Sequence, residues 1–217
     1  MQILVLTLFP EMFDAFWSHG MMRKAVEQGS ITAAALNIRD FAPGWHQVTD
    51  DRPYGGGSGM VMKPEPLAAA IRTARERAPA APVILMAPQG RVFSQAAARE
   101  MAALPEIILV CGRYEGVDDR LSRDLITDEL SIGDYVLTGG EVAAMAVIDA
   151  VTRLIPGVLG GADSAERDSF SNGLLEHPHY TRPPEFEGAE VPEVLLTGHH
   201  RNIERWRLAA SLMRTFV

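Results

Sequence analysis

Ser131-Ile-Gly-Asp-Tyr-Val-Leu-Thr-Gly-Gly-Glu141 is the stretch that decides the fold of this chain. It predicts a short strand, a glycine turn, a second strand-like run over Tyr135–Leu137, and a helix that a Gly-Gly pair opens at Glu141. Glycine has no Cβ, so it allows the backbone to approach a ligand closely. The stretch therefore indicates a ligand loop at the end of a strand.

A second segment of the same kind lies upstream. Ile107-Ile-Leu-Val-Cys-Gly-Arg-Tyr-Glu-Gly116 predicts an apolar strand that ends in a glycine loop carrying an aromatic ring and a carboxylate. Two such loops, each at the C-terminal end of a predicted strand, favour one small-molecule pocket at the edge of an α/β sheet.

The rest of the first 160 residues alternates between strands and helices. Further strand-like runs are Ile3–Leu8, Ile31–Ile38 and Val83–Ala87. Segments compatible with helices are Pro10–Gln28, Pro66–Arg77, Ser94–Ala103 and Glu141–Ile155. This alternation predicts the α/β class, with a mostly parallel sheet and helices on both of its faces.

The composition changes after Pro156-Gly157, where small, charged and glycine residues follow one another. We expect an α/β domain over residues 1–160, a flexible linker over 161–171, and a small helical domain over 172–217. The tail from Gly198 to Val217 predicts a helix with apolar residues on two sides, which is typical of a helix packed on two sides or at an interface.

Bulk composition limits the function classes. The chain has 217 residues, and its 20 basic and 28 acidic residues give a formal net charge of −8, which offers no electrostatic reason to expect nucleic acid but leaves a local basic patch open. Cys111 is the only cysteine and lies in an apolar run, so we predict a buried structural thiol and no intrachain disulfide. A signal peptide and a membrane-spanning run are both missing, so we expect a cytoplasmic protein without membrane contact.

Two familiar nucleotide motifs are absent. The predicted first strand is not followed by G-x-G-x-x-G, which disfavours a dehydrogenase and the commonest methyltransferase architecture. The loop Tyr54-Gly-Gly-Gly-Ser-Gly-Met60 has no G-K-[ST] after it, so it is not a P-loop. It is either a plain solvent loop or, as we favour, a loop that closes over a bulky planar ligand.

Single polar residues carry weaker signals. Glu115 is either a solvated carboxylate or the partner of a cationic ligand group. Arg153 could simply compensate a helix dipole, and Asp168 could be a solvated or capping carboxylate. His177-Pro-His179 and His199-His200 have no matching cysteine or carboxylate set, so we predict no protein metal site from them.

Taken together, these segments resemble one family, the bacterial tRNA (guanine-N1)-methyltransferases that modify the guanosine just 3′ of the anticodon. The resemblance rests on Thr7–Phe13, Asp51–Met60, Gly112–Arg120, Ser131–Glu141, Arg153–Leu159, Asp168–Phe170 and His179–Pro183, which occur in the family order and span nearly the whole chain. Each segment alone is weakly specific, whereas the ordered set is highly specific.

The resemblance implies a trefoil-knotted α/β methyltransferase domain that binds S-adenosylmethionine and works as a homodimer. Neither periodicity nor composition indicates the knot, which departs from the usual topology rules. The implied cofactor-binding residues are Pro88, Gly112, Arg113, Tyr114, Glu115, Gly116, Ser131, Ile132, Gly133, Tyr135, Leu137, Gly139 and Gly140. The resemblance also implies a need for Mg²⁺, although the sequence contains no dedicated set of protein ligands for that ion.

The resemblance gives Asp168 and Arg153 catalytic roles. Asp168 would accept the N1 proton of the target guanine, and Arg153 would stabilise the negative charge that grows on O6. The tRNA would be contacted by Gly55, Gly56, Gly57, Ser58, Gly59, Met60, Arg182 and Arg201. Two alternatives stay open: a knotted methyltransferase that acts on another RNA, and a non-catalytic RNA-binding module.

Overall fold

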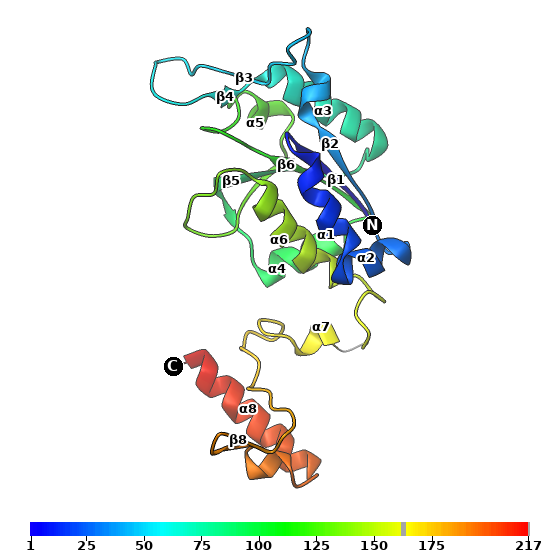
Figure 1. The fold of residues 1–217 in the computed structure, drawn as a ribbon, viewed down its shortest axis with the longest axis vertical. Helices are drawn as coiled ribbons and strands as arrows, with labels where there is room; N and C mark the ends of the chain where they lie inside the picture. Colours follow the sequence, from blue (N-terminus) through cyan, green and yellow to red (C-terminus); the bar gives the residue numbers. More distant parts are fainter. Residues whose placement is uncertain (162–163, 217) are drawn as a thin grey trace. The chain divides into compact units, whose positions relative to one another are not determined.

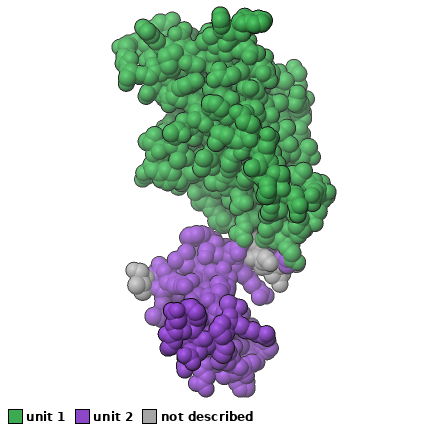
Figure 2. Space-filling model, in the orientation of Figure 1, with its two compact units in different colours: residues 1–160 green, residues 161–217 purple. Residues whose placement is uncertain are grey.

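A computed structural model describes residues 1–161 and 164–216 of the chain (Figure 1). By their internal contacts these residues form two compact units, Met1–Gly160 and Gly161–Val217, coloured green and purple in Figure 2. Each unit is described by itself below. In the part of the chain that is described, no helix is both long enough and apolar enough to cross a membrane.

The first unit is built on a five-stranded sheet with the order β2-β1-β6-β5-β7. The strands are β1 (Gln2–Thr7), β2 (Thr32–Asn37), β5 (Val83–Val92), β6 (Glu106–Cys111) and β7 (Asp128–Ser131). Every pair of neighbours in this sheet is parallel. The predicted α/β class with a mostly parallel sheet is therefore confirmed, and the trefoil knot stays a prediction.

Helices connect the strands and cover the sheet (Figure 1). They are η1 (Pro10–Phe13), α1 (Asp14–Ser18), α2 (Gly20–Glu27), η2 (Ile38–Phe41), α3 (Pro64–Arg77), α4 (Gln95–Ala102), α5 (Leu121–Asp124) and α6 (Glu141–Thr152). Helix α4 begins where the sequence predicted, because the Ser94 hydroxyl accepts a hydrogen bond from the Ala97 N–H at 3.3 Å.

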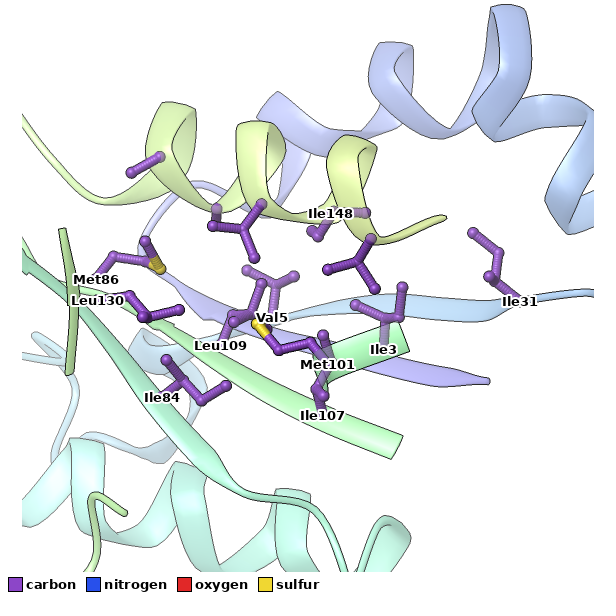
Figure 3. Packing of buried hydrophobic residues seen from close by; sticks show 14 of the residues in the cluster. Ile3, Val5, Ile31, Ile84, Met86, Met101, Ile107, Leu109, Leu130 and Ile148 are labelled. Carbon is purple, nitrogen blue, oxygen red and sulfur yellow. The ribbon is translucent and has the colours of Figure 1, made fainter. Parts of the chain in front are cut away.

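The two faces of the sheet follow directly from the alternation of side chains along its strands. Ile3 and Val5 of β1 point into one apolar cluster with α2, α4 and α6, which Figure 3 shows from close by. Leu4 and Leu6 point into the opposite cluster, which contains α3 and α5. Because both faces are covered, β1 and β6 are apolar along nearly their whole length, as expected for central parallel strands. The prediction of helices on both faces is confirmed.

Two predicted elements are wrong. Tyr135–Leu137 is not a strand but part of a loop, in which the Val136 side chain is 89% exposed, and the fifth strand is β7 (Asp128–Ser131). Pro10–Gln28 is not one helix, because His19 has an extended backbone (φ −127°, ψ 157°) and separates α1 from α2.

Strand β5 is longer than predicted and is interrupted. Its register against β7 jumps between Met86 and Arg91, although both residues pair with Leu130. The residues between them, Ala87–Gly90, therefore leave the ladder, as the extra residues of a bulge do, and the pairing resumes at Arg91 and Val92.

The remaining elements lie in both units. In the first unit, β3 (Asp50–Asp51) and β4 (Val61–Met62) form a short antiparallel ladder. The described part of the second unit contains α7 (Ser164–Arg167), β8 (Glu185–Phe186), β9 (Ala189–Glu190), η3 (Glu193–Leu195) and α8 (His200–Phe216). The long helix α8 lies where the sequence predicted a tail helix.

Candidate functional site

A cavity of about 330 Å³ opens at the carboxyl ends of β5, β6 and β7. It is lined by the β5 bulge, by the loop after β6, and by the loop between β7 and α6. All of the residues that the resemblance assigned to the cofactor, from Pro88 to Gly140, line this one cavity. Parallel strands place their ligand loops at this edge of a sheet, so the arrangement follows from the topology.

The two glycine loops are joined through their backbones. The Gly140 N–H donates to the Gly112 carbonyl at 2.9 Å, and Arg113 forms an antiparallel bridge with Gly139. A Cβ atom on Gly140 would lie 2.8 Å from Cα of Cys111, so only glycine allows the start of α6 to pack this closely on the end of β6.

The loop after β7 is held by its own hydrogen bonds. The Ser131 hydroxyl accepts from the Gly133 N–H at 3.2 Å, and the Tyr135 hydroxyl donates to the Ile132 carbonyl at 3.3 Å. These contacts turn the chain at Gly133 before it crosses to α6. The apolar side chains of Tyr135, Val136 and Leu137 are left 56%, 89% and 39% exposed at the cavity.

An ion pair beneath the surface holds one of the cavity-lining residues, Arg113, in place. Glu141, 1% exposed, faces the guanidinium of Arg113, with 2.9 Å between Oε2 and Nη2. The Thr7 hydroxyl at the end of β1 donates to Glu141 Oε1 at 2.7 Å. Arg113 also donates to the Thr138 carbonyl at 3.3 Å and stacks over the Phe9 ring at 4.6 Å. Because these groups come from the ends of β1 and β6 and the start of α6, the network fixes three elements around one lining residue.

The predicted substrate loop lies against the predicted cofactor loop. It projects from the β3–β4 ladder, and Tyr54 at its start is fully exposed. At its end, the Met60 carbonyl accepts from the Glu115 N–H at 2.9 Å, and the Met62 N–H donates to the Gly116 carbonyl at 2.9 Å. Gly59 packs on the Glu115 side chain so closely that a Cβ atom would not fit. The structure therefore brings residues 55–60 together with residues 112–116.

The remaining predicted site residues are distributed over both units. Arg153 ends α6 in the first unit, is half-buried, and donates its N–H to the Asp149 carbonyl at 3.2 Å. Asp168 follows α7 in the second unit and is also half-buried; its carbonyl accepts from the Ser171 N–H at 3.1 Å. Arg182 and Arg201 are exposed in the second unit.

The expected flexible linker covers residues 161–171, and residues 162 and 163 lie outside the described part of the chain. Within the described part, the short helix α7 ends at Arg167, directly before Asp168. The loop after it turns sharply at Phe170, whose φ is +68°, and the Phe170 N–H donates to the Leu174 carbonyl at 2.8 Å.

The thiol of Cys111 is fully buried, and burial raises its pKa well above the usual value of a thiol. Such a thiol stays protonated near neutral pH and is a poor nucleophile. The predicted burial of Cys111 is therefore confirmed. Between the cavity-lining residues Val117 and Asp119, a hydrogen bond from Arg120 lowers the pKa of the Asp118 carboxyl.

Several cavity residues escaped the sequence analysis. They include Met86 just before the β5 bulge, Gln89 on the bulge, Asp119 and Ser122 at the start of α5, and Thr138 before the Gly-Gly pair. The Gly139-Gly140 pair did signal close packing at the start of α6. In contrast, no local pattern pointed to the bulge or to the burial of Glu141 opposite Arg113.

Comparison with known proteins agrees with this geometry. A family model described as tRNA (Guanine-1)-methyltransferase TrmD matches residues 1–217. The tRNA (guanine-N(1)-)-methyltransferase of Desulfatibacillum aliphaticivorans is 60% identical over 217 residues, which are 100% of this chain and 83% of that protein. The protein of the same name from Dehalococcoides mccartyi (strain ATCC BAA-2266 / KCTC 15142 / 195) is 57% identical over 216 residues, covering 99% and 87% of the two chains.

A solved structure is similar over almost the full length of the chain. The tRNA (m1G37) methyltransferase from Aquifex aeolicus superposes with a TM-score of 0.82 at 38% sequence identity, covering 99% of this chain and 91% of that one. The likeness therefore includes both units as well as the sheet that carries the cavity.

Proposed function

The chain belongs to the tRNA (Guanine-1)-methyltransferase TrmD family, and we propose that it transfers a methyl group from S-adenosylmethionine to N1 of the guanosine immediately 3′ of the tRNA anticodon. The observation that carries this proposal is the single cavity at the ends of β5, β6 and β7, which every expected cofactor residue lines.

The cavity suits S-adenosylmethionine in size and in chemistry. Its volume of about 330 Å³ lies at the lower end of the ~300–1,000 Å³ typical of small-molecule sites. Peptide groups of the 112–116 and 131–140 loops would hold the adenine and ribose, and the Glu115 carboxylate would face the cationic amino group of the methionine part. When bound, the cofactor supplies an electrophilic methyl group on a sulfonium centre.

The protein's own groups would then prepare the base. Guanine N1 carries a hydrogen, so its lone pair is not available for attack until that proton is removed. A carboxylate can accept this proton as the methyl group arrives, and we assign the role to Asp168. Negative charge develops on O6 at the same time, and we assign its stabilisation to the guanidinium of Arg153.

We assign the contact with tRNA to the loop Gly55–Met60 and to arginines of the second unit, including Arg182 and Arg201. A net charge of −8 makes such local arginines necessary for phosphate binding. The target base must leave its stack to enter a pocket, and we assign closure over that base to the glycine loop. In support, the loop is exposed and its end is hydrogen-bonded to the Glu115 N–H.

We further propose that the enzyme is a cytoplasmic homodimer in which Asp168 of one chain serves the pocket of the other. Exposed apolar surface supports an assembly of two chains. The side chains of Leu208, Leu212 and Phe216 recur every four residues along α8 and are 55%, 40% and 78% exposed, so they form one apolar stripe.

Mixing two inactive variants would test the shared site. Asp168→Ala removes the base, and Gly112→Val fills the cofactor cavity. Co-expressed chains should recover about a quarter of wild-type activity, because half of randomly assorted dimers are mixed and each mixed dimer keeps one complete site. No recovery, with mixed dimers shown by differential tags, would mean that Asp168 serves its own chain.

The part of the chain that the structure describes contains no dedicated Mg²⁺ site. Within residues 1–161 and 164–216, the only group of three or more acidic, histidine or cysteine side chains within reach of one ion is Glu176, His177 and His179. Mg²⁺ prefers oxygen ligands and keeps much of its water, so two imidazoles suit it poorly. No step of the proposed reaction is therefore assigned to Mg²⁺.

The decisive experiment uses S-adenosylmethionine labelled in its methyl group and unmodified tRNA transcripts. Matched transcripts carry guanosine or adenosine immediately 3′ of the anticodon. We expect label only in the guanosine transcripts, with reverse transcription arrested there, because methylation at N1 blocks the Watson–Crick edge. Label at another nucleotide or in another RNA would support the alternative substrate, and RNA binding without label would support a non-catalytic module.

A further inference from the structure

The second unit contains a cluster of three metal-ligating side chains on one short segment, Glu176-His177-Pro178-His179. One ligand atom from each of Glu176, His177 and His179 lies within 4.8 Å of the others. Glu176 Oε1 is 3.0 Å from His179 Nε2, and the two imidazole rings have centroids 4.7 Å apart. Small side-chain rotations would bring all three atoms to one ion, since ligands bonded at ~2.0–2.2 Å lie about 3.3 Å apart around it.

The ring of His177 has a hydrogen-bond partner of the kind that metal-binding histidines have. Its Nδ1 lies 3.2 Å from the Pro178 carbonyl oxygen, which can only accept a hydrogen bond. Nδ1 must therefore carry the hydrogen, and Nε2 presents a lone pair. Histidine ligands of metals characteristically donate their second ring N–H to a carbonyl or a carboxylate in this way.

The segment is fixed on helix α8 and on the loop after α7. The Glu176 N–H donates to the Ser169 hydroxyl at 3.0 Å, and the Glu176 carbonyl accepts from Arg214 at 3.3 Å. The neighbouring Leu175 N–H donates to the Thr215 hydroxyl at 2.9 Å. Because backbone groups on both sides of the first ligand are held, less conformational entropy is lost when an ion binds.

We propose that Glu176, His177 and His179 form a site for a divalent transition-metal ion, with Zn²⁺ as the best match. Two imidazoles and one carboxylate are ligands that Zn²⁺ and its first-row neighbours accept, whereas Mg²⁺ does not favour them. Three protein ligands leave a coordination position for water or for an anionic oxygen. Both histidines line a cavity of about 530 Å³ together with Arg182 and Arg207, whose positive charge suits an anion at that position.

The test uses the metal-free full-length protein and Zn²⁺ alone, titrated against a chromophoric chelator. We expect one ion per chain, and we expect Co²⁺ at the same site to give the visible absorption bands of a four-coordinate complex. Glu176→Gln, His177→Ala and His179→Ala should each weaken Zn²⁺ binding by at least ~10-fold. Losses of ~10–100-fold in metal affinity are typical even when only a residue hydrogen-bonded to a metal ligand is replaced. A large excess of Mg²⁺ should not displace the ion.

The chain offers a matched control in His199 and His200, an adjacent histidine pair in the same unit that lies outside the cluster. His199→Ala/His200→Ala should bind Zn²⁺ like the wild type. Circular dichroism of each variant separates lost ligands from lost folding, and Glu176→Gln preserves the shape of the side chain. The proposal is overturned if the wild type binds less than one ion per chain, or if folded Glu176→Gln and His177→Ala keep wild-type affinity.

Discussion

Replacing Glu141 by alanine should lower the free energy of unfolding of the first unit by about 3 kcal/mol. The carboxylate is 1% exposed and pairs with Arg113, whose side chain is 18% exposed. Removing one member of a buried ion pair typically costs ~3–5 kcal/mol, because the other charge stays buried without its partner. The lower end applies here, since Arg113 keeps some contact with water and its hydrogen bond to the Thr138 carbonyl.

Thermal unfolding followed by far-UV circular dichroism measures this effect. At ~2–4 °C per kcal/mol for a unit of this size, Glu141→Ala should lower Tm by about 6–12 °C. Glu141→Gln should lose less, because the amide oxygen can still accept the hydrogen bond from the Thr7 hydroxyl. In the double variant Arg113→Met/Glu141→Ala, the loss should be clearly smaller than the sum of the two single losses. A Tm change below 2 °C for Glu141→Ala, or strictly additive losses, would refute the view that this pair holds the three elements together.

Four further outcomes follow from the site. Asp168→Asn should keep cofactor affinity but reduce single-turnover methylation by at least ~10²-fold; activity within a few-fold of wild type would remove the assignment of the base. A Cβ atom on Gly112 would meet nothing closer than 3.8 Å, whereas one on Gly140 would lie 2.8 Å from the Cys111 backbone. Calorimetry should therefore show weakened cofactor binding by a normally stable Gly112→Val, while Gly140→Ala should lose Tm first. Because burial raises the pKa of the Cys111 thiol, iodoacetamide at pH ~8 should label it only after unfolding; rapid labelling of the native protein would contradict its burial. Trypsin should cut after the exposed Arg167 more slowly when cofactor and tRNA are both present, and equal rates would rule out ordering of this segment by RNA.

Much of the first unit was predictable because its strands are buried on both faces. The runs Ile3–Leu8 and Ile107–Cys111 are almost entirely apolar, so the existence of both strands could be read from the sequence. Their ends differ by no more than one residue from the observed Gln2–Thr7 and Glu106–Cys111. The ligand loops could be located for the same reason, since parallel strands that end in glycine loops must place those loops at one edge of the sheet.

The secondary-structure predictions were wrong in segments whose apolar composition does not match their burial in the fold. Tyr135–Leu137 has the composition of a strand, yet its side chains face outward at the cavity. The true edge strand, Asp128–Ser131, begins with two carboxylates and carries almost no strand signal of its own. It forms because β5 offers an unpaired edge, which is a tertiary effect that no local window contains.

The ion-pair partner of the buried Glu141 carboxylate could not be predicted from the sequence either. Glu141 looked like an ordinary acidic residue in the first turn of a helix, where it would favour the helix dipole. Its role depends on Arg113, 28 residues earlier in the sequence. Such a pairing is set by the close approach of the start of α6 to the end of β6, and only the folded chain displays it.

The backbone bonds between Met60 and Glu115 and between Met62 and Gly116 have a thermodynamic consequence. A ligand that moves one loop strains these bonds unless the other loop follows. With the donor and the RNA assigned to these loops as proposed, we therefore expect the occupancy of one site to be energetically coupled to that of the other. Such coupling is reciprocal: if the methyl donor tightens RNA binding by some factor, RNA must tighten donor binding by the same factor. Measuring the donor's affinity with and without RNA would therefore give the strength of the loop connection without any knowledge of the RNA contacts.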